Sequence, residues 1–255
     1  MSGISRWSLP TAVLAATLAL GAPSASFAQQ PGQPGEPGPT SIIAGHTIVD
    51  AVDDVRGATA GLVASLLEGG ERLGIPNWEQ QQSRLQAMQN ALQDMEDELD
   101  QKADATDASW LSWLEDDDYT VTVTRQIRAL GDHLDELSSV LGGGWDTSNM
   151  QVVVGHEVLD QLDELRETTG DLLGALSEAG SDYGWRYNTA QHDDARQALD
   201  RLEQNLNRKR EGGDADLLIF MQEQQYHTLA HENVQTIADI LSNILHADKQ
   251  KTDGE

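Results

Sequence analysis

Apolar residues recur three or four positions apart along most of the chain beyond residue 40, which is the period of amphipathic helices. The period is clearest in residues 85–99, where the apolar positions are Leu85, Met88, Leu92, Met95 and Leu99. Similar stripes cover residues 48–66, 127–141, 158–176, 195–206 and 219–244. Helices joined by short breaks tend to pack antiparallel. The pattern therefore predicts an all-α antiparallel bundle whose first two helices form a coiled-coil-like hairpin.

Glycines and capping residues set the predicted helix ends, because glycine tolerates the left-handed conformation that follows many helices. We expect one helix over residues 40–68 and a second beginning at residue 77. Further helices are expected over residues 108–114, 122–141, 148–179, 189–211 and 214–247. Residues 119–124 form a β-branched run that alternates as strands do, and residues 152–154 are a second, shorter β-branched run. We interpret both as extended lead-ins to helices, with an edge strand as the alternative.

The first 28 residues have the three-part layout of a secretory signal peptide. Arg6 precedes an apolar run over about residues 11–20, and a small-residue segment ends at Ala28, where cleavage is expected. Residues 29–39 are rich in proline and glycine and predict a disordered linker. The domain organisation that follows is a helical domain over residues 40–248 and a disordered tail over residues 249–255.

The charge balance limits the possible partners. The chain has 43 acidic and 16 basic residues and a formal charge of −27, and loss of Arg6 on cleavage lowers the charge to −28. Such a charge repels nucleic acids and anionic lipid surfaces, so nucleic-acid binding is not expected. An abundance of Asp with few Lys fits either a protein folding in salty surroundings or an ordinary acidic secreted protein. Both predict lower stability at low ionic strength.

Cysteine is absent from the sequence, so no disulfide and no lipoprotein anchor on the mature terminus are expected. Apart from the residue 11–20 run, no segment approaches the roughly 20 apolar residues that a spanning helix needs. The sequence therefore predicts a periplasmic or secreted protein that is not embedded in the membrane.

One constellation suggests metal chemistry. Glu223, His227 and His231 follow one another at four-residue steps, which would place them on one face of a continuous helix. Two imidazoles four residues apart are a workable metal-ligand pair, with the carboxylate as a third ligand or an orienting group. The alternative is that these histidines hydrogen-bond neighbouring helices, since the His-Glu-x-x-His motif of zinc proteases is absent.

Tryptophan supplies the second set of candidate residues. Five tryptophans fall at helix starts, short segments or loops, away from the heptad stripes. Tryptophan at such places often anchors an interface, although it also plugs the ends of bundles. The interface candidates are Trp78, Trp110, Trp113, Trp145 and Trp185.

Catalytic signatures are missing from the sequence: it has no thiol, no Gly-x-Ser-x-Gly elbow and no phosphate-binding loop. We therefore expect a non-enzymatic interaction or structural protein of the cell envelope that needs no cofactor. Its partner would be another envelope or secreted protein, or a second copy of itself. The alternative is a periplasmic ligand- or metal-binding bundle that uses Glu223, His227 and His231.

One stretch supports a more specific expectation. Residues 195–241, ARQALDRLEQNLNRKREGGDADLLIFMQEQQYHTLAHENVQTIADIL, form a Gln-rich helix, a Gly-Gly break and a second helix. With the signal peptide and the Trp-containing middle, this order resembles the minor pilin subunits of type IV secretion and conjugation systems. The resemblance implies a place at a pilus tip and contact with other cells. The chain lacks the cysteine-containing middle usual in that family, and no functional residues are carried over.

Overall fold

A computed structural model of the protein describes residues 39–103, 107–146, 151–183, 185, 189–223 and 225–244. These residues are almost entirely helical and include no strand, so the all-α expectation is confirmed. The predicted signal peptide (1–28) and tail (249–255) lie outside the described residues, as does the predicted linker except for its last residue. The helices are α1 (Pro39–Gly69), α2 (Trp78–Ala103), α3 (Asp107–Glu115), α4 (Asp117–Leu141), α5 (Val152–Ala179), the 3₁₀ helix η2 (Gly180–Tyr183), α6 (Thr189–Arg210), α7 (Gly213–Gln222) and α8 (Gln225–Ile244).

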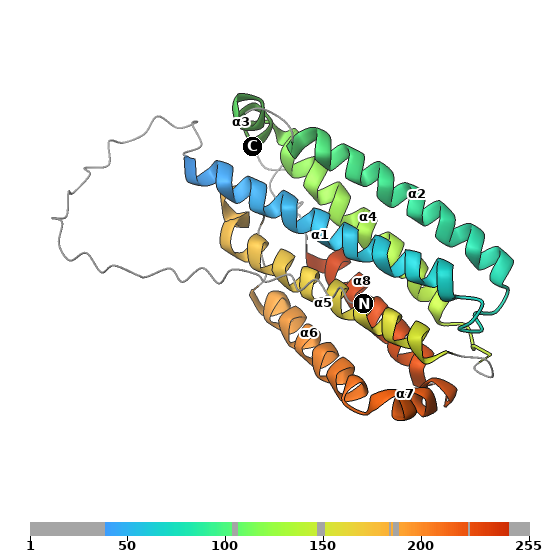
Figure 1. Cartoon of the computed structure of the whole chain (residues 1–255). Coiled ribbons are helices and arrows are strands. Elements are labelled where there is room, and N and C mark those ends of the chain that lie inside the picture. Colours follow the sequence, from blue (N-terminus) through green and yellow to red (C-terminus); the bar gives the residue numbers. More distant parts are fainter. Residues whose placement is uncertain are drawn as a thin grey trace, which may run out of the picture. The chain divides into compact units, whose positions relative to one another are not determined.

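Four long helices, α1, α4, α5 and α8, form the centre of the helical unit. The two most extensive contacts are those of α1 with α5 and of α4 with α8 (Figure 1). The helices of each pair run antiparallel: Gly61 lies against Gln161 and Gly69 against Val154, while Gly131 lies against Ser242 and Ser138 against His231. Helix α2 covers α1 and α4, and α6 covers α5 and α8. The short helices α3 and α7 pack on α4 and α8.

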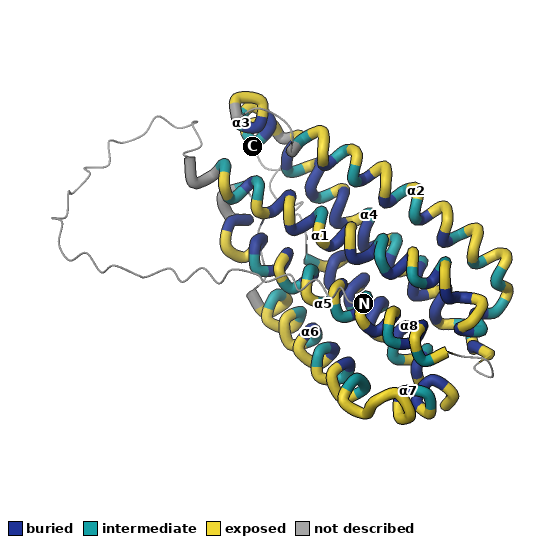
Figure 2. The backbone as a smooth tube through the Cα atoms, viewed as in Figure 1, coloured by how far each residue is buried: buried dark blue, intermediate teal, exposed yellow. Residues whose placement is uncertain are grey.

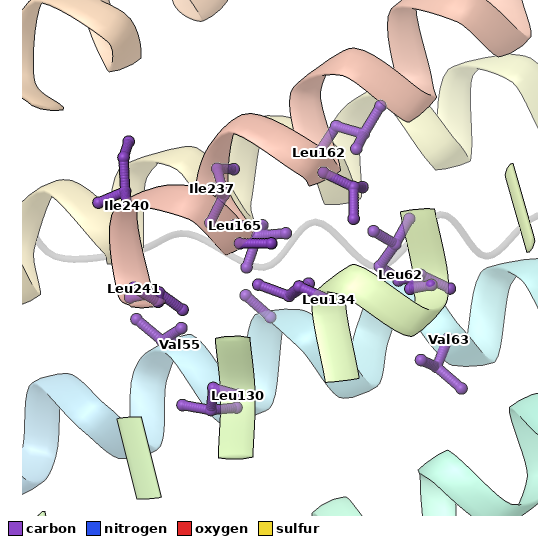
Figure 3. Close-up of a cluster of buried hydrophobic side chains, with 14 of the residues drawn as sticks. Val55, Leu62, Val63, Leu130, Leu134, Leu162, Leu165, Ile237, Ile240 and Leu241 are labelled. Carbon is purple, nitrogen blue, oxygen red and sulfur yellow. The ribbon is translucent and has the colours of Figure 1, made fainter. Parts of the chain in front are cut away.

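The core consists of the apolar stripes found in the sequence. Every stripe residue in α1, α2, α4 and α5 is buried, and the outer faces of α2 and α6 are exposed (Figure 2). Helices from both ends of the chain contribute to the centre of the core (Figure 3), where the labelled residues are Val55, Leu62, Val63, Leu130, Leu134, Leu162, Leu165, Ile237, Ile240 and Leu241. Burial of this apolar surface is the main favourable contribution to folding.

Both predicted extended lead-ins are helical, which corrects the sequence interpretation. Residues 119–124 belong to α4, and residues 152–154 begin α5. The buried residues of the first run are Tyr119, Thr122 and Val123, which follow the helical spacing of three and four, whereas Val121 is 58% exposed. The alternation of β-branched residues was therefore a weaker signal than the positions that pack against α1.

The predicted final helix over residues 214–247 is in fact two helices, α7 and α8. Helix α7 ends at Gln222 and is capped by Glu223, whose backbone N–H donates to Ile219 O at 3.0 Å. Helix α7 buries Phe220 and Met221, and α8 buries Tyr226. A spacing of five or six residues between these positions does not fit one continuous apolar face. The break between α7 and α8 lets the apolar face of each helix pack against the core. Ile219, which was expected to face inward, is 52% exposed.

The first half of the helical unit, residues 39–146, and the second half, residues 151–244, repeat one plan. Each contains two long helices, a short helix and a third long helix in the same order. Corresponding residues lie 110 positions apart in α1 and α5, and 107 positions apart in the later helices. Each inner helix packs against its own counterpart, as at a two-fold interface. The halves therefore resemble two subunits of a symmetric dimer joined in one chain.

Equivalent contacts support this description. The hydroxyl of Tyr119 donates to Gly45 O at 3.2 Å, and that of Tyr226 donates to Gly155 O at 2.8 Å. The aromatic contacts also repeat: Trp113 packs edge-on against Tyr119 and Phe220 against Tyr226, while Lys102 lies over the Trp113 ring and Lys209 over the Phe220 ring. The ion pair of Arg56 with Asp53 corresponds to that of Arg166 with Asp163. The hydroxyl of Thr59 donates to Val55 O, and that of Thr169 donates to Leu165 O.

Candidate functional site: the seam between α6 and α8

Four of the five candidate interface tryptophans lie inside the helical unit. Trp110, Trp113, Trp145 and Trp185 are at most 7% exposed, and Trp78 is partly buried against the core. Trp110 stacks on His46 with ring centroids 3.7 Å apart. Side chains placed this way stabilise the fold and leave little ring surface for a partner. The described surface therefore does not present these tryptophans as anchors.

The metal-ligand ladder is interrupted by the break between α7 and α8. Glu223 ends α7, whereas His227 and His231 lie on α8, so the three residues do not share one helix face. His231 Nδ1 lies 2.9 Å from both Ser138 Oγ and Ser138 O. Burial and the nearby His231 lower the pKa of His227. Among the residues that the structure describes, no group of three His, Asp or Glu side chains could hold a metal ion.

A difference between the two halves points to another site. We call the groove between α2 and α4 the first seam, and its counterpart between α6 and α8 the second seam. Three ion pairs cross the first seam along its length and link α2 to α4. They are Arg84–Glu136 (Nε to Oε1, 3.1 Å), Arg125–Glu98 and Lys102–Asp118 (Nζ to Oδ2, 3.3 Å).

The second seam lacks these bridges because the residues at the corresponding positions differ. Gln191 and Asn243 occupy the places of Arg84 and Glu136, and Glu232 occupies the place of Arg125. Helix α8 contains no Lys or Arg. Within the described residues, no Lys or Arg of α6 forms an ion pair with α8. The two walls of the second seam are therefore not tied to each other by charge.

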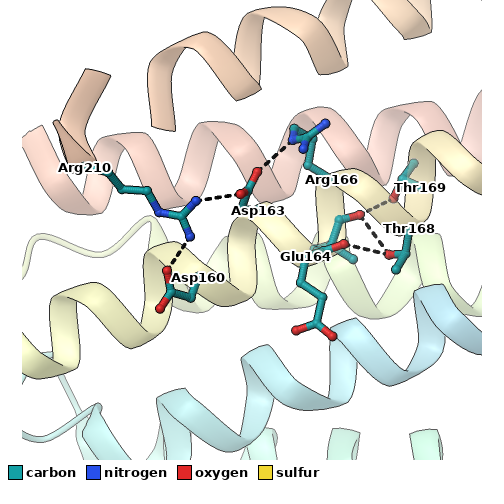
Figure 4. Close-up of polar contacts among 8 residues, drawn as sticks. Asp160, Asp163, Glu164, Arg166, Thr168, Thr169 and Arg210 are labelled. Carbon is teal, nitrogen blue, oxygen red and sulfur yellow. Dashed lines mark hydrogen bonds and ion pairs between the residues drawn. The ribbon is translucent and has the colours of Figure 1, made fainter. Parts of the chain in front are cut away.

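Helix α6 is attached to α5 instead. Arg210 Nη1 donates to Asp163 Oδ2 at 2.7 Å, and its Nη2 pairs with Asp160 (Figure 4). Arg166 Nε holds the other oxygen of Asp163 at 3.0 Å. This network fixes the C-terminal end of α6 on α5 and leaves its α8-facing side without an ionic closure.

Two cavities open along the second seam. The first, which we call the acidic cavity, has a volume of about 460 Å³. Its floor is apolar and comprises Leu173, Ala195, Ala198, Ile240 and Ile244, and its rim carries Gln191, His192, Asp194, Thr236, Asp239 and Asn243. The second, of about 680 Å³, lies toward α7 and carries charges of both signs, from Arg208, Lys209, Glu223 and Glu232, together with His227.

The first seam has a cavity of similar volume, about 470 Å³, at the position corresponding to the acidic cavity. It differs in chemistry: the Arg84–Glu136 ion pair bridges it, and Met88 and His133 fill the places that Ala195 and Ile240 hold in the second seam. Burial lowers the pKa of His133, although Glu136 and Asp132 oppose that effect. The acidic cavity thus combines an unbridged opening with an apolar floor, an arrangement suited to binding a side chain or short segment.

Reasoning from the sequence missed this site because it did not compare the two halves. The signal is present in the sequence. Residues 52–70 (VDDVRGATAGLVASLLEGG) and 162–180 (LDELRETTGDLLGALSEAG) match at a spacing of 110, with the Asp, Arg, Thr and Leu positions in register. Continued past this stretch at the spacing of 107 that relates the later helices, the internal repeat would have paired Arg84 with Gln191 and shown which seam lacks the bridging charges.

The fold and the seams define an all-helical protein of two similar halves with one unbridged groove. The chain matches no protein-family model, no curated protein and no solved structure. Across the described helices, none is both long enough and apolar enough to cross a membrane.

Proposed function

We propose that the protein is an exported, non-enzymatic interaction protein of the cell envelope that binds another protein through its second seam. The observation that carries this proposal is the contrast between the seams: three ion pairs bridge the first, whereas the second has an apolar floor between walls that no ion pair joins. Helix pairs with an open apolar groove commonly receive a segment of a partner.

Export supports the assignment to the envelope. The N-terminal 28 residues have the layout of a cleaved signal peptide. The more specific proposal is a minor pilin-like component of a type IV secretion or conjugation system. The stretch that carries this resemblance, residues 195–241, contributes most of both walls of the second seam.

Site-specific photocrosslinking in the native cell tests the proposal. A photoreactive residue placed at Thr236, which lines the acidic cavity, is expected to form an adduct with one envelope protein. The matched control is Ala129, the half-buried counterpart in the first half. Adducts of equal yield and identity at both positions, or none at Thr236 in correctly exported protein, would contradict a role for the second seam.

Metal or small-ligand binding is the second candidate, because Glu223 and His227 line the same 680 Å³ cavity. Their side chains come from different helices, so a metal would require them to converge on binding. Calorimetric titration of zinc into the mature protein tests this function. Heat that His227→Ala removes would support a metal site, and heat identical in the two proteins would exclude His227 as a ligand.

A further inference from the structure

The acidic cavity has a specific chemistry, and we infer that it is the docking groove for an amphipathic segment of a partner protein with an apolar ridge flanked by Lys or Arg. This inference rests on the proposed function and adds the chemical identity of the segment. Three features of the cavity carry it: the length of its apolar floor, the charge of its rim, and the absence of the groups that close its counterpart.

The floor sets the length of the segment. On α6 the lining residues extend from Gln191 to Ala198, and on α8 from Thr236 to Ile244, which is about two helical turns on each wall. With a rise of about 1.5 Å per residue, each wall is about 11 Å long. A ridge of apolar side chains at positions i, i+4 and i+7 of a helix spans the same distance. The volume of about 460 Å³ accommodates a few such side chains rather than a whole helix.

The rim sets the charge of the segment. Asp194 stands on the α6 wall and Asp239 on the α8 wall, and both are exposed. Neither carboxylate forms an ion pair with a residue of the described structure, and no Lys or Arg lines the cavity. The chain as a whole carries a formal charge of −27. A basic segment would be attracted over a distance and would then pair with both walls, whereas an acidic one would be repelled.

The counterpart cavity shows how this chain bridges such a groove. In the first seam, Arg84 and Glu136 meet across the cavity, and the larger Met88 lines it. In the second seam the corresponding residues are Gln191, Asn243 and Ala195. The same scaffold thus holds a bridged copy and an open copy of one groove.

Two synthetic peptides test the inference on the mature full-length protein. The first is a 14-residue amphipathic helix with Leu at one ridge and Lys on both flanks, and the second has Glu in place of each Lys. Fluorescence anisotropy is expected to show saturable binding of the Lys peptide. Binding is expected to weaken several-fold between about 50 and about 300 mM salt, because salt screens the rim charges and the Debye length at 0.1 M is about 10 Å. The Glu peptide is expected not to bind.

Three double variants separate the features of the cavity. Asp194→Asn with Asp239→Asn removes the rim charges and is expected to weaken Lys-peptide binding about ten-fold, since each exposed ion pair contributes modestly. Asp94→Asn with Asp132→Asn makes the same change in net charge on exposed positions of the first half and is expected to leave binding unchanged. Gln191→Arg with Asn243→Glu installs the bridge of the first seam and is expected to abolish binding without loss of stability.

Several results would overturn the inference. They are equal binding of the two peptides, equal weakening by the rim variant and the Asp94/Asp132 control, and undiminished binding in the bridged variant. Concentration-dependent self-association that only the bridged variant abolishes would assign the groove to a second copy of the chain. If the Lys peptide fails to bind while Thr236 still yields its adduct in cells, the partner chemistry is wrong and the proposed function stands. If the Lys peptide binds while Thr236 yields no adduct in cells, the chemistry of the groove is right and the proposed function is wrong.

Discussion

Helices α2 and α6 occupy the same place in the two halves, but they are held in different ways. Three ion pairs connect α2 to α4, and Arg56 Nη1 adds a link from α1 to Glu96 of α2 at 3.1 Å. Helix α6 pairs with α5 through Arg210 and makes no Lys or Arg pair with α8 in the described structure. The comparison teaches that the apolar core fixes where the outer helix lies, whereas a few surface charges decide whether ion pairs bridge the groove beside it.

The largest expected effect tests whether the halves share one core. Leu62 and Leu172 occupy corresponding positions and are both fully buried. Truncation of either to Ala is expected to lower the free energy of unfolding by about 3 kcal/mol, because each leaves a cavity at the contact of α1 with α5. Denaturant unfolding followed by circular dichroism measures both. A single transition with similar losses is expected, and two separate transitions would show that the halves unfold independently.

The next effect concerns the paired tyrosines. Tyr119→Phe and Tyr226→Phe each remove a buried hydrogen bond, to Gly45 O and Gly155 O respectively, without creating a large cavity. Each is expected to cost about 1 kcal/mol, because a buried hydrogen bond is lost while the carbonyl oxygen keeps its partner within the helix. Thermal unfolding of the two variants measures the loss. A cost at one position and none at the other would show that the contacts are not equivalent in energy.

A smaller effect is expected when the first seam is made like the second. Arg84→Gln with Glu136→Asn removes an ion pair whose side chains are 35% and 43% exposed. We expect a loss below about 1 kcal/mol that shrinks as salt is added, since exposed pairs are weak and screened. A double-mutant cycle at low and high salt isolates the pair. A loss that persists at high salt would mean that packing, rather than charge, closes the first seam.

The smallest effect is pH-dependent and lies at the contact of α1 with α5. Burial raises the pKa of Asp54 above 3.8, and the neighbouring Asp53, Asp50 and Asp171 raise it further. The folded protein thus holds this proton more tightly than the unfolded chain does, and the stability that Asp54 contributes at acid pH is lost as the pH rises through its raised pKa. Asp54→Asn is expected to raise the free energy of unfolding at pH 7 by no more than about 0.5 kcal/mol. Thermal unfolding would show this gain as a slightly higher melting temperature.

The advantage of Asp54→Asn should disappear below about pH 3.8, where the carboxyl group is protonated in both states. Glu164→Gln, at the corresponding position of α5, is the control. Glu164 accepts a hydrogen bond from Gln161 Nε2 at 3.2 Å, so its replacement is not expected to stabilise the protein. A gain at position 54 that is independent of pH would rule out the repulsion argument.

Much of the fold could be predicted from the sequence because the helices follow their apolar periods. The stripe from Leu85 to Leu99 is buried as predicted, and α6 begins and ends within a residue of expectation. The apolar period did not predict a helix at residues 119–124, where alternating Val and Thr are typical of a strand. It also did not reveal the end of α7 at Glu223, because the slip in the apolar stripe occurs within one short polar stretch.

The candidate site was less predictable, for a physical reason. Whether Asp194 and Asp239 face one cavity depends on the distance and rotation between α6 and α8, and neither is encoded locally in either helix. The histidines and tryptophans were conspicuous by residue type, but the tryptophans are mostly buried and His231 contacts Ser138. The groove is instead defined by uncharged residues such as Gln191 and Asn243, which stand where the first seam has an ion pair.

The meeting of α1 with α5, and of α4 with α8, means that the inner walls of each half are built from the other half. A substitution on an inner helix therefore disturbs both halves at once, whereas one on the outer face of α6 disturbs neither. We therefore expect substitutions to be tolerated best on the outermost helices, where recognition can change while the shared interior is kept.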